Sequence, residues 1–274
     1  MGEAMQLGAS SRLGNGFIRM TPAAPQTLLE NAGLAFLGEQ SWTPAVVTAA
    51  EARALATARN PTGRPNHDVL RRLTGVKSGR PHEPWQIDFP PHYTEQEAAL
   101  YLEPCRQLRS QRQDSTVRWW LNPSAQPELR TALARLERFL ATPLAAAVPT
   151  WDWIDSNLLP DDSLLVAARD DDFVHGLLGS RLFQVWWREH RLHVSPPTVV
   201  ASFPFPWSPG TLLSSLSRLQ EEQRLALARA ARGADPEQIH RAAAAAYGWP
   251  LDLPDEELLA HLTDLNHSRS LAGL

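Results

Sequence analysis

The chain has 274 residues and a formal net charge of −4, and 43% of its residues are hydrophobic. This length and composition allow a substantial core in one large domain or two small ones, which excludes a disordered chain. The net charge argues against a generally basic protein that coats DNA. The single cysteine, Cys105, excludes an internal disulfide and a cysteine-rich zinc site within one chain.

No stretch approaches the roughly 18 consecutive apolar residues that a membrane helix needs. The N-terminus MGEAMQLGAS has no basic region followed by an apolar run. We therefore expect a soluble, cytoplasmic protein with no membrane partner.

Positive charge is concentrated in two segments. Residues 59–80 have a local net charge of +5, and residues 105–140, with seven arginines, have +4, which leaves −13 for the rest of the chain. Binding of DNA phosphates by one face would require this kind of segregation. The alternative is a pair of solvated helix faces.

The first region, residues 1–91, is rich in proline and glycine. It predicts an irregular segment with short elements and a basic loop region. A helix is expected near Ala45–Ala58. A short strand is expected at 85–89, where tryptophan, isoleucine and phenylalanine alternate.

The second region, residues 92–207, begins with helical signals. Thr94 and Glu97 form a capping box, so a helix should start at Glu95 and stop near Pro104. Pro127 suits the first turn of another helix. Its predicted apolar stripe consists of Leu129, Leu133, Leu136 and Leu140.

The end of this region is predicted to contain strands. Segments 163–168 and 173–178 are typical of two strands that flank a polar hairpin turn at 169–172. Ser180 can cap a short helix through Trp187.

The third region, residues 208–274, is predicted to be a helical extension. Asp235 and Pro236 are suited to the start of a helix that ends before Gly248, and Pro254 opens a last helix. A further helical face is expected to hold Leu212, Leu216 and Leu219. The whole chain is predicted to be α+β, with a mixed small-sheet core followed by these helices.

Several blocks of the sequence resemble, in order, segments of one protein family. They include NAGLAFLG (31–38), NPTGRPNHDVLRRLTG (60–75), PWQIDF (84–89), TEQEAALYLEP (94–104), RWWL (118–121), RFLATP (138–143), LLPDDSLLVAARDDDFVHGLLGSRLFQVWW (158–187), SFPFPW (202–207) and YGWPLDLPDEELLAHLTDLN (247–266). The family is the class I S-adenosylmethionine-dependent bacterial DNA adenine methyltransferases, including MmeI-like fused restriction-modification enzymes. The chain resembles the C-terminal, target-recognition half of these enzymes.

The catalytic half of that family has a glycine-rich cofactor loop and an Asn/Asp-Pro-Pro-Tyr/Phe motif. Gly14-Asn15-Gly16 follows no apolar strand and precedes no clear helix. Asp88-Phe89-Pro90-Pro91 has the wrong order, and both sequences are better interpreted as turns. The resemblance therefore implies no catalysis by this chain alone, with S-adenosylmethionine on a catalytic partner or a missing half.

The resemblance implies a module that binds double-stranded DNA and reads a target sequence for adenine-N6 methylation, because a recognition module must hold the duplex and read base edges. Within the matching blocks, the residues placed first for this role are Arg118, Arg169, Ser180 and Arg181. A backbone-contact segment is expected to contain Arg64, Asn66, Arg71, Arg72 and Lys77. The alternative is that the arginines are exposed salt-bridge partners and that Ser180 is a helix cap.

The segment LAAAVPTWDWID at 144–155 departs from the family, which usually has a basic, histidine-containing run there. Either readout has shifted to Thr150, Trp151 and Asp152, or the module has lost DNA affinity. Trp151 can stack on a splayed base, but its spacing from Trp153 also suits an ordinary strand.

Other functional classes are less well supported by the sequence. His190 and His193 lack a third ligand of good spacing, so no metal site is expected. One alternative function is a protein-interaction or assembly module of a methyltransferase or defence complex that does not read DNA. A hydrolase that uses a His/Asp site is a further alternative.

Overall fold

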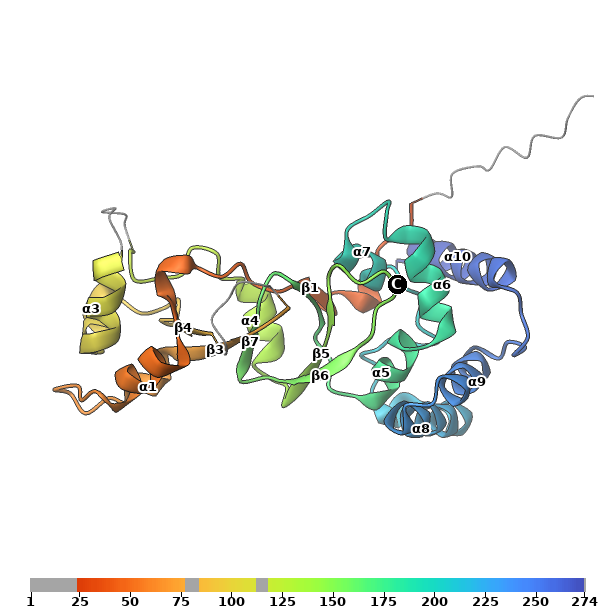
Figure 1. Cartoon of the computed structure of the whole chain (residues 1–274). Coiled ribbons are helices and arrows are strands. Elements are labelled where there is room, and N and C mark those ends of the chain that lie inside the picture. Colours follow the sequence, from red (N-terminus) through yellow and green to blue (C-terminus); the bar gives the residue numbers. More distant parts are fainter. Residues whose placement is uncertain (1–23, 77–83, 112–117, 274) are drawn as a thin grey trace, which may run out of the picture.

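The computed structural model describes residues 24–76, 84–111 and 118–273, which form two lobes arranged end to end (Figure 1). Each lobe holds a four-stranded sheet. The strand order is β2-β4-β3-β7 in the N-terminal lobe and β1-β8-β5-β6 in the C-terminal lobe. The C-terminal lobe continues into helices, so the predicted α+β class with a helical C-terminal stretch is confirmed.

The N-terminal lobe is built from short elements. They are β2 (Val46–Val47), α1 (Ala49–Thr57), β3 (Leu70–Thr74), β4 (Trp85–Ile87), α2 (Glu95–Ala99), α3 (Leu102–Gln111) and, from far along the chain, β7 (Leu158–Pro160). Strand β7 pairs parallel to β3, and the other neighbours pair antiparallel. The helices and strands share one buried cluster that includes Leu55, Ile87 and Leu108.

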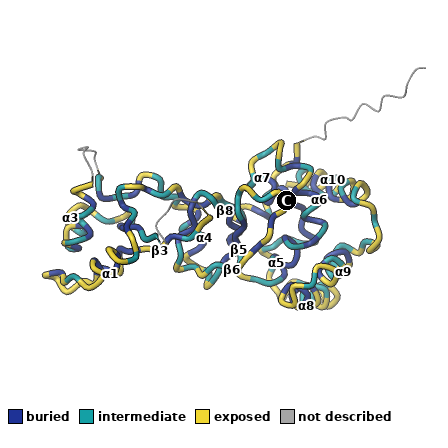
Figure 2. Tube along the Cα trace, viewed as in Figure 1, coloured by how far each residue is buried: buried dark blue, intermediate teal, exposed yellow. Residues whose placement is uncertain are grey.

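The sheet of the C-terminal lobe is covered on both faces. Its strands, all antiparallel, are β1 (Ala35–Leu37), β5 (Arg138–Pro143), β6 (Asp152–Asp155) and β8 (Leu164–Ala167). Because side chains alternate along a strand, Leu140 packs with the C-terminal helices, whereas Phe139 packs on α4 (Pro127–Leu133). Figure 2 accordingly shows β5 and β8 as buried.

The remaining helices form the far end of the C-terminal lobe (Figure 1). They are α5 (Asp172–Leu178), α6 (Arg181–His190), α7 (Pro196–Ala201), α8 (Arg218–Gly233), α9 (Pro236–Tyr247) and α10 (Asp255–Ala272). Across both lobes, short 3-10 helices lie at Leu29–Asn31, Thr43–Ala45, Asn66–Val69 and Leu213–Ser215. Asp235 caps α9, and Gly248 ends it at φ 71°, as predicted. Within the described residues, no helix has the length and apolar character to cross a membrane.

The two sheets meet at Asp161, between β7 and β8. The Asp161 N–H donates to the Thr74 carbonyl at 2.9 Å, and Asp161 forms an isolated bridge with Glu39. A Cβ added to Gly38 would overlap the backbone carbonyl of Asp161. This close approach requires glycine at position 38.

The predicted capping box is confirmed. The Thr94 N–H donates to Glu97 Oε2 at 2.7 Å, and the Glu97 N–H donates to Thr94 Oγ1 at 3.2 Å. The helix stops at Ala99, earlier than predicted, and α3 begins at Leu102. Pro104 lies in the first turn of α3, where its missing N–H is tolerated.

Three predictions about secondary structure are wrong. Residues 173–178 lie in helix α5, because Asp171 caps it by accepting the Val174 N–H at 2.8 Å. Leu140 lies in strand β5, so the leucine stripe of α4 ends sooner. Helix α8 begins at Arg218, and Leu212 precedes it with 72% of its surface exposed, so the expected helical face does not form.

Candidate nucleic-acid interface

The predicted DNA-binding residues fall on both lobes. The N-terminal lobe carries Arg64, Asn66, Arg71, Arg72 and Arg118, and the C-terminal lobe carries Thr150, Trp151, Arg169, Ser180 and Arg181. Lys77 lies outside the described residues. The described part of the expected backbone-contact segment lies in the N-terminal lobe, whereas the residues placed first for recognition are divided between the two lobes.

Four arginines of the N-terminal lobe have exposed side chains: Arg64, Arg71, Arg72 and Arg118. Arg64 lies over the ring of Tyr101, 6.0 Å from its centroid. Arg118 donates to the Pro91 carbonyl at 2.7 Å and has a φ of 66°, a left-handed conformation that costs energy for a residue with a Cβ. These arginines are accessible to an anionic partner.

Three of the predicted residues have structural roles. Asn66 is fully buried, and its amide donates to the carbonyls of Leu55 at 2.7 Å and Ala58 at 3.1 Å, which ties down the end of α1. Ser180 is 1% exposed, and its hydroxyl accepts the Phe183 N–H at 3.4 Å, so the cap alternative is confirmed. Trp151 lies in the core of the C-terminal lobe. We therefore leave these three out of the candidate interface.

The other residues of the C-terminal lobe differ in their surroundings. Arg181 forms an ion pair with Asp255 of α10 at 2.5 Å. The alternative that this arginine is a salt-bridge partner is therefore confirmed. Arg169 is half-buried, and its charge opposes the burial that raises the pKa of Asp171. Thr150 is exposed. Their contacts with DNA stay predictions.

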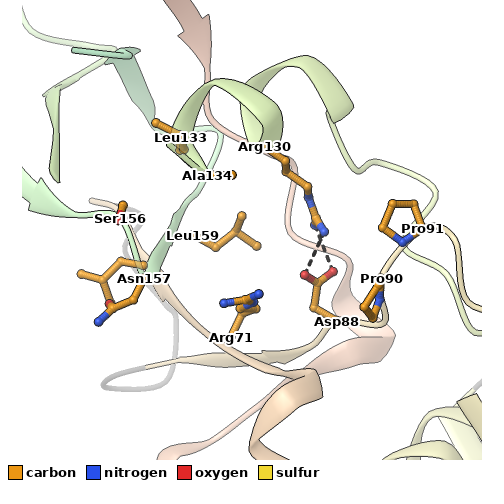
Figure 3. Close-up of a pocket in the computed structure, with 11 residues that line it drawn as sticks. Arg71, Asp88, Pro90, Pro91, Arg130, Leu133, Ala134, Ser156, Asn157 and Leu159 are labelled. Carbon is orange, nitrogen blue, oxygen red and sulfur yellow. Dashed lines mark hydrogen bonds and ion pairs between the residues drawn. The ribbon is translucent and has the colours of Figure 1, made fainter. Parts of the chain in front are cut away.

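A pocket of about 480 Å³ lies where the two lobes meet. Strands β3 and β7, the segment after β4, helix α4 and the turn before β7 supply its walls. The lining residues are Arg71, Asp88, Pro90, Pro91, Arg130, Leu133, Ala134, Ser156, Asn157, Leu158 and Leu159 (Figure 3). We call this the junction pocket.

Two residues that line the junction pocket, Asp88 and Arg130, belong to a buried ion triad with Glu39. Arg130 of α4 donates to both oxygens of Glu39, at 2.6 and 2.7 Å, and to both oxygens of Asp88, at 2.8 and 2.9 Å. Glu39 is 2% exposed and Asp88 is 6% exposed. Glu39 follows β1 and Asp88 follows β4, so Arg130 ties the two lobes together.

Burial sets the electrostatics of the triad. It raises the pKa of Asp88, while the charges of Arg130 and then Arg71 oppose the rise. For Arg130, the two carboxylates outweigh burial and raise the pKa above its usual value, so the guanidinium stays charged. The triad carries one positive and two negative formal charges when both acids are ionised. Arg71 is the cation that offsets the excess negative charge of the triad.

The sequence did not reveal this triad. Arg130 was counted with the basic segment 105–140, whereas its side chain is taken up by two acids. Glu39 and Asp88 lie 91 and 42 residues away along the chain. No local pattern connects positions so far apart.

Comparison with known proteins finds a likeness in fold. No family model matches the sequence, and a search of curated proteins gives no match. A solved structure of the type IIL restriction-modification enzyme MmeI in complex with DNA matches 92% of this chain, with a TM-score of 0.52 and 15% sequence identity. The match covers 37% of the MmeI chain. At this identity the likeness shows a shared fold. It supports a fold related to restriction-modification enzymes and does not test which half of such an enzyme the chain resembles.

Proposed function

We propose that the chain binds double-stranded DNA as the target-recognition part of an adenine-N6 methyltransferase or restriction-modification system. The observation that carries this proposal is the fold shared over 92% of the chain with an enzyme solved on DNA. The sequence blocks that resemble the methyltransferase family in the same order support the same assignment to its target-recognition half. Catalysis and S-adenosylmethionine binding would belong to a methyltransferase region outside these residues.

The exposed arginines of the N-terminal lobe are the proposed phosphate contacts. Arg64, Arg71 and Arg72 are exposed within one short segment that includes strand β3. Arginine is suited to this role because its planar fork pairs with phosphate oxygens, and each phosphate neutralised releases a counterion. Arg118, Arg169, Arg181 and Thr150 are left as candidates for base-edge or further phosphate contacts, beside Lys77.

The test measures how duplex affinity depends on salt. A labelled duplex is titrated with the full chain by fluorescence anisotropy at several salt concentrations. The test variant replaces Arg64, Arg71 and Arg72 by glutamine. The control variant removes three exposed arginines of α8 and α9 in the same way, at positions 218, 229 and 241.

Wild-type affinity is expected to fall steeply with salt, and the test variant is expected to flatten the logarithmic slope by up to about 3. The control should keep the wild-type slope. Sequence reading would appear as one enriched motif when the chain selects from a random duplex library. Wild-type protein without salt-sensitive binding at low ionic strength would refute the proposal.

An assembly role is the second candidate, favoured by exposed leucines before and within the first turn of α8. Leu212, Leu213 and Leu219 are 72%, 62% and 62% exposed. Apolar side chains that gather at the surface often mark a protein contact. This role predicts that a Leu212→Ser and Leu213→Ser variant loses binding to the cognate methyltransferase region while duplex binding is unchanged.

A further inference from the structure

The junction pocket contains a cation, Arg71, that balances the charge of the triad but whose guanidinium has no hydrogen-bond or ion-pair partner in the described part of the chain. Arg71 lies on β3 opposite Gln86 of β4, which fixes its backbone position. Its side chain is exposed and lines the pocket, and among the described residues it makes no hydrogen bond or ion pair. Figure 3 shows Arg71 in the floor of the pocket, drawn between Asn157 and Asp88.

The second arginine of the pocket cannot take its place. Arg130 already donates four hydrogen bonds to Glu39 and Asp88. A guanidinium has about five N–H donors, so almost all of its capacity is used. An anion that enters the pocket would therefore pair with Arg71.

Charge alone would hold such an anion weakly. The triad has a net negative formal charge, and Arg71 brings the local sum to zero. A small inorganic anion would meet a neutral site with a carboxylate close by. Binding needs a further contribution, which the apolar wall can supply.

The pocket is large enough for an organic group beside the anion. Its volume of about 480 Å³ falls in the usual range for small-molecule sites, roughly 300–1,000 Å³. Six apolar residues line it: Pro90, Pro91, Leu133, Ala134, Leu158 and Leu159. Ser156 and Asn157 add neutral hydrogen-bonding groups to the lining. This combination fits a phosphate ester with a ring system.

We propose that the junction pocket binds a single nucleotide, with its phosphate group on Arg71 and its base or sugar against the proline and leucine wall. The nucleotide can be free or can belong to an unstacked position of a DNA strand, and both sources share this chemistry. In the second case the assignment rests on the proposed DNA-binding function. In the first case it is independent of that function.

The experiment titrates the full chain with deoxyadenosine monophosphate by isothermal calorimetry at fixed ionic strength, beside inorganic phosphate. Three variants are compared with wild type. Arg71→Gln removes the proposed phosphate ligand, and Arg71→Lys keeps the charge without the planar fork. Arg53→Gln is the control, since it removes one exposed arginine from α1, away from the pocket. Thermal unfolding of each variant checks that the fold is intact.

Wild type is expected to bind the mononucleotide at least about tenfold more tightly than inorganic phosphate, since the organic part buries apolar area. Arg71→Gln should weaken mononucleotide binding by about tenfold or more, Arg71→Lys by less, and Arg53→Gln not measurably. Absent mononucleotide binding, unchanged binding in Arg71→Gln, or phosphate binding as tight as mononucleotide binding would overturn the assignment.

Competition then identifies the source of the nucleotide. Displacement of the mononucleotide by a single-stranded or duplex oligonucleotide assigns the pocket to DNA, and the absence of displacement assigns it to a free nucleotide. The chain could bind the mononucleotide through Arg71 and show no salt-sensitive duplex binding. That result would support the nucleotide site and refute the proposed DNA-binding function. Salt-sensitive duplex binding without mononucleotide binding would support DNA binding and refute the nucleotide site.

Discussion

Replacement of Arg130 by alanine is expected to be the most damaging single change at the lobe junction. The variant loses four hydrogen bonds of 2.6 to 2.9 Å and leaves Glu39 and Asp88 buried without their cation. Breaking a buried ion pair on one side costs about 3–5 kcal/mol, because a charge stays in the interior uncompensated. Whole domains are stable by only about 5–15 kcal/mol. The loss should therefore be a large fraction of the total.

The deficit should depend on pH. Burial already raises the pKa of Asp88, and Arg130 is the main group that opposes the rise. Without Arg130 the folded-state pKa rises further above the unfolded value. The cost is then fully present above the folded-state pKa and shrinks as the pH falls through it, since the buried carboxyl takes up a proton. The difference between wild type and variant should be larger at neutral pH than at about pH 5.

Urea unfolding followed by tryptophan fluorescence at both pH values measures this difference. Arg135→Ala is the matched control, because Arg135 is exposed just after α4 and should change the free energy of unfolding by less than about 0.5 kcal/mol. A triple variant with Glu39→Gln, Asp88→Asn and Arg130→Met removes all the charges and should recover most of the loss. A deficit no larger than that of the control, or one that grows at acid pH, would refute the reasoning.

Three further predictions concern the fold. Gly38→Ala should cost about 2 kcal/mol or more in thermal unfolding, because its Cβ meets the rigid backbone of Asp161; a silent substitution would contradict this contact. Asp171→Ala should lose about 1 kcal/mol of stability through the missing helix cap, with Asp170→Ala as an exposed control, and equal losses would argue against the cap. Burial, and next the charge of a neighbouring histidine, lower the pKa of His190 from 6.5 to about 4, so up to about 3 kcal/mol of stability should be lost as the pH falls between these values. A His190→Phe variant that keeps the same acid dependence would assign the loss to other groups.

The sequence predicted those parts of the fold that depend on neighbouring residues. The caps at Thr94 and Asp235 were found because donor and acceptor lie within three residues of each other. The prediction of a strand at residues 173–178 was wrong because a short apolar run has no distinct period. The cap at Asp171 is local, but helix α5 also packs on α8, where Gly176 lies close to Leu227, far along the chain.

For the candidate interface, the net charge of a segment likewise does not show which arginines are available to bind DNA. Segment 105–140 has seven arginines, which suggested a broad phosphate-binding face. Arg130 is used by the buried triad, Arg138 pairs with Asp172 at 3.1 Å, and Arg106 pairs with Glu103 at 2.5 Å. A local net charge cannot separate these arginines from Arg71, since their partners are assigned only by the tertiary fold.

Exposure therefore decides which arginines can bind DNA. In segment 59–80, the side chains of Arg64, Arg71 and Arg72 remain accessible, and Arg71 and Arg72 point to opposite faces of β3 because they are consecutive in a strand. Both cannot contact the same phosphate. If Arg71 serves the junction pocket, Arg64 and Arg72 remain the proposed duplex contacts, with Arg72 on the other face of the sheet. Single substitutions then separate the two roles: Arg72→Gln should reduce the salt slope of duplex binding, whereas Arg71→Gln should reduce mononucleotide binding.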